Sequence, residues 1–346
     1  MYNKTIDYLK QPGTVASWRQ IKTGLIRGLS DPWATAAPYQ VRSMAVKEAC
    51  TTMSRCKLKY KQTGRINTAS FRSKHASKQS FYLSKAAIDS KGFMKRTLGY
   101  MRYAEKLPET IEFDCRVVLD HGVWYVSIPV NMTIKVPKTK ELFVALDPGV
   151  RTFQTFYSPT VAGSIGSRAW ERLFKRCVAL DDIKSKLASK SLRAKNRRQL
   201  KIASDRISRQ IKFLRDELHW KTATFFAKSF HYIIIPEFSA QEMSKKSKRK
   251  IRSKTVRNML TQAHSLFRER LKQQAAKYGS TVFVTSEAYT SKTCTRCGHE
   301  HTTLGGSEVF RCPSCGLIVS RDINGARNIL LRAMPDLADV VLHRKY

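Results

Sequence analysis

The sequence CTRCGHEHTTLGGSEVFRCPSCGLIVSRDINGARN, residues 294–328, determines how the rest of the chain is interpreted. Fourteen residues separate its two Cys-x-x-Cys pairs, which are Cys294 with Cys297 and Cys312 with Cys315. Seven residues after the last cysteine comes Asp322, at the predicted start of a helix. The stretch therefore combines a predicted metal site with a carboxylate next to it.

The four paired cysteines predict a structural zinc site. Zn²⁺ prefers four tetrahedral ligands, and a Cys-x-x-Cys turn places two sulfurs at adjacent corners while backbone amides point toward them. Four thiolates close the coordination sphere, so the predicted role is structural. His299 and His301 lie nearby in the sequence, and we expect both to be solvated rather than ligands.

Composition indicates a nucleic-acid partner. The 346 residues include 64 Lys and Arg against 26 Asp and Glu, which gives a formal charge of +38. This excess exceeds what solubility requires and favours a polyanion. No apolar run is long enough to span a bilayer, and the N-terminus lacks a signal core. The other four of the eight cysteines are scattered, which favours a reducing compartment over a disulfide framework.

Two cationic stretches extend this prediction. Residues 184–215 contain twelve Lys or Arg and a single acid, with apolar residues at helical spacing, and predict a basic pair of helices broken near 190–196. Residues 245–257 contain eight cations and no acid. A solvated face, or a nuclear-localisation signal in the second stretch, remains the alternative. The predicted nucleic-acid contacts are Lys184, Arg193, Arg197, Arg198, Lys245, Lys246, Lys248, Arg249, Lys250 and Arg252.

Two carboxylates stand at the ends of predicted buried strands. LFVALD (142–147) ends in Asp147, and HYIIIPEF (231–238) contains Glu237 just after its apolar run. Catalytic and ligand-binding groups collect where strands of such sheets end. Acids that converge there need a cation between them, and Mg²⁺ or Mn²⁺ accepts carboxylate oxygens. In isolation, Asp147 also fits a turn, Glu237 a solvated acid and Asp322 a helix cap.

The order of elements is more specific than any single acid. It runs strand-Asp-hairpin, long insertion, strand-Glu, basic helix, strand, cysteine pairs, Asp-helix. This order predicts an α/β fold with a ribonuclease-H-like (RuvC-type) mixed sheet and a zinc ribbon inserted before the last acid. ALDPGVRTF, IIIPEF, TSKTCTRCG and CPSCGLIVSRDINGARNIL resemble RuvC-type segments of the TnpB family of transposon-encoded nucleases, and the wording is most similar to its eukaryotic and giant-virus branch, Fanzor.

The resemblance implies an RNA-guided DNA endonuclease that uses guide RNA to select target DNA. It implies catalytic, Mg²⁺-binding (or Mn²⁺-binding) roles for Asp147, Glu237 and Asp322, and zinc ligation by the four cysteines. Base pairing would supply sequence specificity. The expected state is a monomer with no membrane partner, located in the nucleus if the host is eukaryotic.

The resemblance also divides the chain. Family members begin with wedge strands that this chain lacks, so we expect an N-terminally shortened form with a helical recognition segment and a partial β wedge. The expected parts are a helical recognition-type segment at 1–110, a partial wedge hairpin at 111–140, a RuvC-like core at 141–290 with a basic helical hairpin at 170–220, a zinc ribbon at 291–319, and a final RuvC segment with tail at 320–346.

Two other functions fit the same residues. A nucleic-acid-binding regulator would use the charge and the zinc site without cutting. A transposase or DNA recombination protein would join strands, since ribonuclease-H-like folds also perform that chemistry. The intact acids favour cleavage over the first, and the lack of an end-binding domain weighs against the second.

Overall fold

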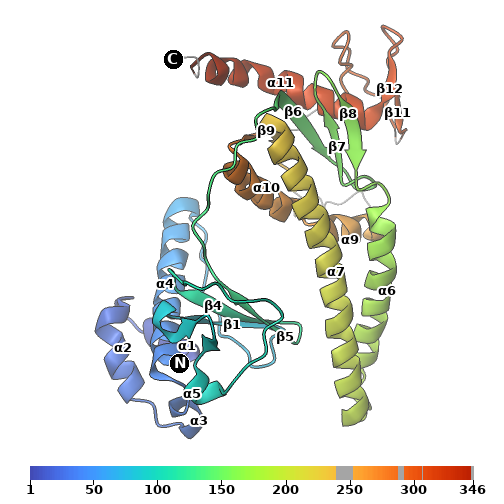
Figure 1. Ribbon diagram of the computed structural model, residues 1–346. Helices are drawn as coiled ribbons and strands as arrows, with labels where there is room; N and C mark the ends of the chain where they lie inside the picture. The colour runs from blue at the N-terminus through green and yellow to red at the C-terminus, as the bar shows by residue number, and fades with distance from the viewer. Residues whose placement is uncertain (239–251, 287–291, 306, 344–346) are drawn as a thin grey trace. The chain divides into compact units, whose positions relative to one another are not determined.

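The computed structural model describes residues 1–238, 252–286, 292–305 and 307–343. The chain forms two compact units, Met1–Asn131 and Met132–Tyr346 (Figure 1). Within the described ranges, no helix has both the length and the apolar character needed to cross a membrane. The predicted cationic contacts Lys245, Lys246, Lys248, Arg249 and Lys250 lie outside the described residues.

The first unit begins with a small helical layer, as predicted. Its helices are α1 (Tyr2–Leu9), α2 (Trp18–Arg27), α3 (Pro32–Thr35) and α4 (Tyr39–Thr63). Apolar side chains from three of them meet in one core, in which Leu9, Ile26 and Val46 are buried. The helical spacing of apolar residues along α4 therefore has the expected cause, which is one face packed on its neighbours.

A three-stranded antiparallel sheet completes this unit. The predicted hairpin is present as β4 (Cys115–Asp120) and β5 (Val123–Ser127). Its two turn residues, His121 and Gly122, both have positive φ, as a tight hairpin turn requires. Smaller elements lie between the first strand and β4: η1 (Lys85–Ala87), β2 (Ile88–Asp89), β3 (Gly92–Phe93) and α5 (Lys95–Leu98).

The first strand of this sheet corrects the sequence analysis. Residues 1–110 were expected to be mostly helical, but Lys78–Leu83 forms β1 and pairs with β4. The expected lone hairpin is therefore one part of a larger sheet. Its apolar residues Phe81 and Leu83 pack in the core of that sheet. The strand was missed because its partner lies more than 30 residues away, and a dense mixture of cations and aromatics masks its alternation.

The second unit is built on a mixed five-stranded sheet, which confirms the predicted architecture. The strand order is β10-β9-β6-β7-β8. An antiparallel meander contains β6 (Glu141–Pro148), β7 (Gln154–Tyr157) and β8 (Ala162–Ile165). Two parallel strands, β9 (Phe230–Pro236) and β10 (Thr281–Thr285), extend it on the other side of β6. The central strands are continuous apolar runs because both of their faces are covered.

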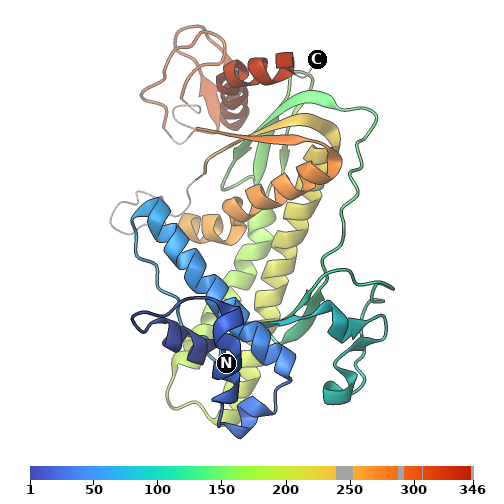
Figure 2. The same ribbon diagram turned by 90° about the vertical axis from the view of Figure 1, so that its left-hand side faces the viewer.

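Helices cover the two faces of this sheet separately (Figures 1 and 2). On one face, Val144 and Leu146 of β6 pack with residues of α7 (Ala194–Ser229) and α10 (His264–Tyr278). On the other, Ala145 packs with Ile329 and other residues of α11 (Arg321–His343). Successive side chains of a strand point to opposite faces of the sheet. Even-numbered residues of β6 such as Val144 therefore pack on α7 and α10, and odd-numbered residues such as Ala145 pack on α11.

The remaining helices agree with the sequence analysis except at one break. The basic pair consists of α6 (Ala169–Ala188) and α7, which are separated by the predicted turn. The expected order of elements had one helix before the last strand, whereas the structure has α9 (Ser253–Gln262) followed by α10. Ala263 between them has a φ of 50°, a left-handed conformation that ends α9. Nothing in the alanine side chain signals this break.

Lys140 joins two helix ends just before β6. Its Nζ donates to the carbonyl oxygens of Ala227 and Tyr278, at the C-termini of α7 and α10, and to Oγ of Ser280. Burial lowers the pKa of Lys140, but all three donors have acceptors. A cation is favourable where helix carbonyls lack intrahelical partners.

Replacing this lysine should destabilise the second unit. Lys140→Met keeps the length of the side chain but leaves the helix-end carbonyls without their charged donor, so we expect the free energy of unfolding to fall by about 2 kcal/mol. Urea denaturation measures the change. Lys138→Met, at an exposed position two residues earlier, is the matched control and should change stability little; equal effects of the two substitutions would contradict the assigned role.

Candidate active site and zinc ribbon

Parallel pairing brings the ends of β6 and β9 to the same edge of the sheet. Ala145 lies opposite Ile234, so Asp147 is level with Pro236, the last residue of β9. Glu237 follows immediately, and its backbone N–H donates to the carbonyl oxygen of Thr285 at the end of β10, 2.8 Å away. Residues 90 positions apart in the sequence thus lie at adjacent strand ends, where the sequence analysis expected them.

Helix α11 approaches Asp147 closely. Asp147 has the same parity as Ala145, so it faces the α11 side of the sheet. A Cβ on Gly325 would lie 2.7 Å from Oδ2 of Asp147, so any larger residue there would force the carboxylate to move. Asp322 is in the first turn of α11. It is three residues before Gly325 and therefore on the same side of the helix.

The three acids lie at this edge of the sheet, but their carboxylate oxygens do not form a compact cluster. Among the residues that the structure describes, the only group of three or more candidate ligands within 4.8 Å of one another is made of cysteines. The oxygens of Asp147, Glu237 and Asp322 are therefore spread more widely than that. Glu237 and Asp322 are exposed to solvent, and Asp147 is half-buried. Their joint ligation of a cation stays a prediction.

Two side chains of α9 hold the turn that follows Asp147. At Gly149 a Cβ would come 2.6 Å from the carbonyl oxygen of Thr152, so this turn needs glycine. The carbonyl oxygen of Val150 accepts two hydrogen bonds from α9, one from Asn258 at 2.5 Å and one from Gln262 at 3.0 Å. Both amide side chains are buried. The sequence analysis missed this pair, whose only signal was two polar residues four positions apart on an otherwise apolar helix face.

Two buried histidines flank Phe153, which lies further along the same turn. The ring of Phe153 stacks between His219 and His264, with centroids 5.1 and 5.3 Å away. His219 Nδ1 accepts from Arg270, so its Nε2–H donates to the carbonyl oxygen of Gln262. Both histidines are therefore neutral: burial lowers the pKa of His219 to about 3 and that of His264 to about 4.

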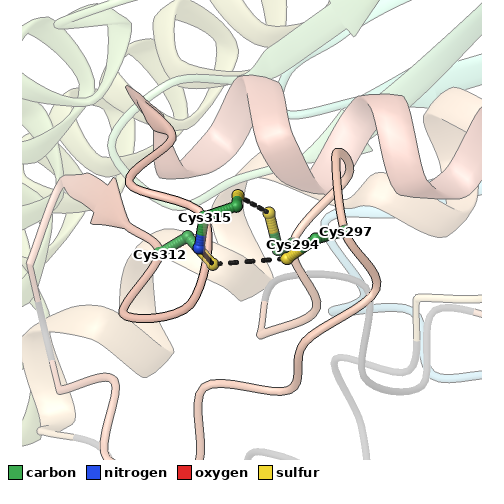
Figure 3. A group of neighbouring side chains, drawn as sticks. All are labelled: Cys294, Cys297, Cys312 and Cys315. Atoms are coloured by element: carbon green, nitrogen blue, oxygen red, sulfur yellow. Dashed lines mark hydrogen bonds between the residues drawn. The ribbon is translucent and has the colours of Figure 1, made fainter.

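The four cysteines gather as predicted (Figure 3). Sγ of Cys294 lies 3.6 Å from that of Cys315, and Sγ of Cys297 lies 3.6 Å from that of Cys312. Four tetrahedral bonds of about 2.3 Å place sulfurs about 3.8 Å apart, so this spacing fits one zinc ion. It is far too long for a disulfide, which needs about 2.05 Å. No histidine belongs to the group among the described residues.

Two equivalent turns hold the sulfurs. Gly298 donates its N–H to Cys294 O, and Gly316 donates to Cys312 O; both glycines have positive φ. The N–H of Cys315 points to Sγ of Cys312 at 3.5 Å and, as the largest influence, helps to lower the pKa of that thiol to about 6. This favours the thiolate, the form that binds zinc. Strands β11 (Val309–Arg311) and β12 (Ile318–Ser320) complete the ribbon.

Two asparagines of α11 fasten the ribbon to the helix. Asn324 accepts from the N–H of Thr295 and donates to the carbonyl oxygen of Thr293 at 2.8 Å. Asn328 donates to the same carbonyl at 2.6 Å. Both are at least nine-tenths buried. Within the motif RDINGARNI, only Asp322 was predicted to have a role; the spacing of four between the two asparagines was the available signal.

The predicted cationic contacts that the structure describes differ in their surroundings. Lys184, Arg193 and Arg198 are exposed on the α6–α7 pair, and Arg252 is exposed before α9. Arg197 instead donates to the carbonyl oxygens of Leu187 and Ser189 at 2.9 and 2.7 Å. Its guanidinium closes the turn between the two helices.

Comparisons with known proteins agree with this architecture. Residues 264–329 match the family model described as Cas12f1-like, TNB domain. The putative transposase A625R of Paramecium bursaria Chlorella virus 1 is 31% identical over 314 residues, which are 87% of this chain and 70% of that protein. The TnpB-like protein L79 of Acanthamoeba polyphaga mimivirus is 28% identical, over 60% of this chain and 40% of its own length.

A bacterial relative and a solved structure extend the likeness. The putative RNA-guided DNA endonuclease InsQ of Escherichia coli (strain K12) is 28% identical, over 67% of this chain and 60% of that protein. The cryo-EM structure of a Cas12f1–sgRNA–target DNA complex superposes with a TM-score of 0.50 at 15% identity, covering 95% of this chain and 79% of that one. At this identity the likeness concerns the fold. It supports the ribonuclease-H-like architecture.

Removing the metal should release the start of α11. In Cys312→Ser one thiolate is lost, so we expect the chain to lose bound zinc and the amides of residues 293–295 and 321–328 to exchange faster with solvent. Zinc content by elemental analysis and hydrogen exchange by mass spectrometry measure both effects. Cys177→Ser, a buried cysteine outside the ribbon, is the control and should retain zinc. Unchanged exchange in zinc-free protein would contradict the coupling.

Acid should destabilise the second unit through its buried histidines. Because their pKa values are lowered in the folded state, the unfolded chain binds protons first as pH falls below about 6.5. Stability therefore falls from about pH 6.5 toward pH 4, on the order of 2 kcal/mol per histidine at pH 5. Urea denaturation across this range measures it. His219→Gln should flatten the dependence, and an unchanged slope would contradict the assignment.

Proposed function

The chain belongs to the TnpB family, and we propose on that basis that it is an RNA-guided DNA endonuclease of mobile-element origin. One observation carries the proposal: α11 passes so close to Asp147 that a Cβ at Gly325 would lie 2.7 Å from Oδ2 of its carboxylate. This approach joins the last catalytic segment to the first at one edge of the sheet. The relative named as a putative RNA-guided DNA endonuclease supports this activity, and the relative named as a putative transposase supports the mobile-element origin.

We assign Asp147, Glu237 and Asp322 as ligands of one or two Mg²⁺ or Mn²⁺ ions. When bound, such ions activate a water and stabilise the leaving oxygen in phosphodiester cleavage. The residues fit this role because they offer only carboxylate oxygens, the ligands that hard cations prefer. Asp147 contributes a fixed oxygen, since its strand is central and its turn is pinned by Asn258 and Gln262. The two exposed acids approach from the neighbouring strand end and from α11.

Guide RNA and target DNA are the proposed partners. The net charge of +38 supplies attraction for two polyanions, and the exposed cations of the α6–α7 pair offer a phosphate-facing surface. Base pairing between guide and target would provide specificity, so the protein's own contacts need to recognise only backbone shape and a short flanking sequence. The zinc ribbon keeps α11 in place through Asn324 and Asn328 and contributes no group to the cut.

Asp147→Ala should abolish Mg²⁺-dependent DNA cleavage, by about a thousandfold or more, because the best-fixed metal ligand is lost. Co-purified RNA should be retained, since Asp147 is not part of the cationic surface. Gel assays of cleavage and sequencing of the bound RNA measure the two properties. Asp205→Ala, on α7, removes an equal charge and should cleave normally. Robust cutting by the Asp147 variant would exclude this assignment.

Gly325→Ala tests the close approach of α11. Alanine favours a helix over glycine by about 1 kcal/mol, so α11 itself should persist. The new methyl group would collide with the Asp147 carboxylate, and we expect cleavage to fall at least tenfold while helix content and zinc content stay unchanged. A variant that cleaves as wild type would show that this contact does not matter. Gly305→Ala, where nothing lies within 4 Å, is the control.

A further inference from the structure

A large cavity opens where α6 begins, beside the α6–α7 pair. Its volume is about 700 Å³, within the range of ligand sites. Its lining comes from the segment that joins β8 to α6 and from residues 214–225 of α7; Figure 1 shows the backbone of these elements. Charged side chains of both signs and an apolar floor from α7 line it: Arg168, Arg172, Lys221, Glu217, Leu214, Leu218 and Phe225. None of these was among the cationic contacts expected from the sequence.

One side of the cavity suits an anion. Helix α6 has 20 residues and begins at Arg168 and Ala169 without a side-chain cap, and the N–H groups of Ala169 and Glu171 donate to the carbonyl oxygens of Gly166 and Arg168. The positive end of the helix dipole lies at the cavity, because Arg168 and Ala169 both line it. Arg168 and Arg172 are exposed, and neither pairs with an acid in the described part of the chain. Lys221, by contrast, is engaged with Glu217 at 2.7 Å. Two unpaired guanidinium groups therefore stand beside a helix N-terminus.

The other side of the cavity suits a flat apolar group. Phe225 is 44% exposed, although its neighbour Phe226 is fully buried. Leu214 and Leu218 lie earlier on α7, at spacings that bring them to the same helix face as Phe225. An aromatic ring left open beside leucines offers a stacking surface for a base.

A buried hydroxyl in the lining also lacks a partner. Thr222 is only 2% exposed, and its Oγ1 makes no hydrogen bond in the described structure. Unpaired buried polar atoms are rare in native proteins and call for an explanation such as an absent ligand. This observation is independent of the charges at the rim, and it belongs to the same cavity.

We propose that this cavity takes one unstacked nucleotide of a nucleic-acid strand. Its phosphate would lie at the N-terminus of α6 beside Arg168 and Arg172, and its base would lie on Phe225. The combination of an anion site with an aromatic surface selects a nucleotide over a simple anion or an apolar ligand. The inference rests on the proposed function, since it assumes that a strand passes along the α6–α7 pair. The inference adds one position at which the protein binds a base of that strand.

Strands of about ten 2-aminopurine nucleotides test the proposal, because this base brightens when it leaves a stack. The full-length protein is titrated with DNA and RNA versions, and fluorescence and anisotropy are followed together. Phe225→Ala is compared with Phe213→Ala, which removes another exposed phenylalanine of α7 that does not line the cavity. Thr222→Val is included because exchanging an unpaired hydroxyl for a methyl group leaves the fold intact.

We expect wild-type protein and Phe213→Ala to brighten the probe. At saturating strand, Phe225→Ala should lose most of the increase, and Thr222→Val should lose part of it because the buried hydroxyl no longer offers a hydrogen bond. Overall affinity from anisotropy should change less than twofold. If Phe225→Ala and Thr222→Val brighten the probe as wild type does, the proposal is wrong.

The other outcomes of this experiment distinguish a DNA strand, an RNA strand and a free nucleotide as the ligand of the cavity. A response to one of the two strands identifies DNA or RNA as the source. Displacement by an equal concentration of free adenosine monophosphate would overturn the assignment to a strand. A protein that binds strands and cleaves DNA without brightening the probe would contradict the cavity alone. A protein that binds no strand would contradict the proposed function as well.

Discussion

The parallel pairing of β6 with β9 is the constraint on which the site depends. Parallel strands end at the same edge of a sheet, so this pairing brings Asp147 beside Glu237 across a long helical insertion. The pairing is strongly specified because both strands are apolar on both faces. A shift by one residue would exchange Val144 and Ala145 between two different cores. The same apolar runs that stabilise the second unit thus fix the spacing of two acids.

Helix α11 carries Asp322, the third acid of the proposed site, and three independent contacts determine the position of the helix. Apolar residues such as Ile329 pack it on the sheet, Asn324 and Asn328 fasten it to the cysteine ribbon, and Gly325 admits the carboxylate of Asp147. A ribbon of this size has little apolar core of its own, so a bound metal would provide most of its stability. The cysteine ribbon therefore takes no direct part in the proposed cleavage. It affects the proposed site because it holds the start of α11, which carries Asp322.

The sequence alone predicted the parts that local patterns encode. Buried strands 142–147 and 231–238, a hairpin within 111–140, and the grouping of the four cysteines were all confirmed. These features depend on hydrophobic runs, turn residues or fixed spacings. Strand β1 was missed because its evidence lies in a distant partner, and the break at Ala263 was missed because alanine gives no sign of a left-handed conformation.

The support of the site was the least predictable part. Asn258 and Gln262 hold the turn after Asp147, and their importance becomes visible only when the carbonyl oxygen of Val150 is seen between them. The neutral state of the two histidines around Phe153 could not be predicted from the sequence either, because burial rather than residue type sets their charge. The resemblance to TnpB nucleases named the acids, whereas the contacts that position them required the fold.

The central claim is that Asp147, Glu237 and Asp322 share a divalent cation at the edge of the sheet. Anomalous diffraction from crystals soaked in Mn²⁺ tests it most directly, because the signal locates the ion without reference to activity. The account predicts a peak within about 2.5 Å of a carboxylate oxygen of Asp147, with Glu237 and Asp322 drawn toward it. A manganese peak elsewhere, with no density beside Asp147 in well-ordered crystals, would contradict the account.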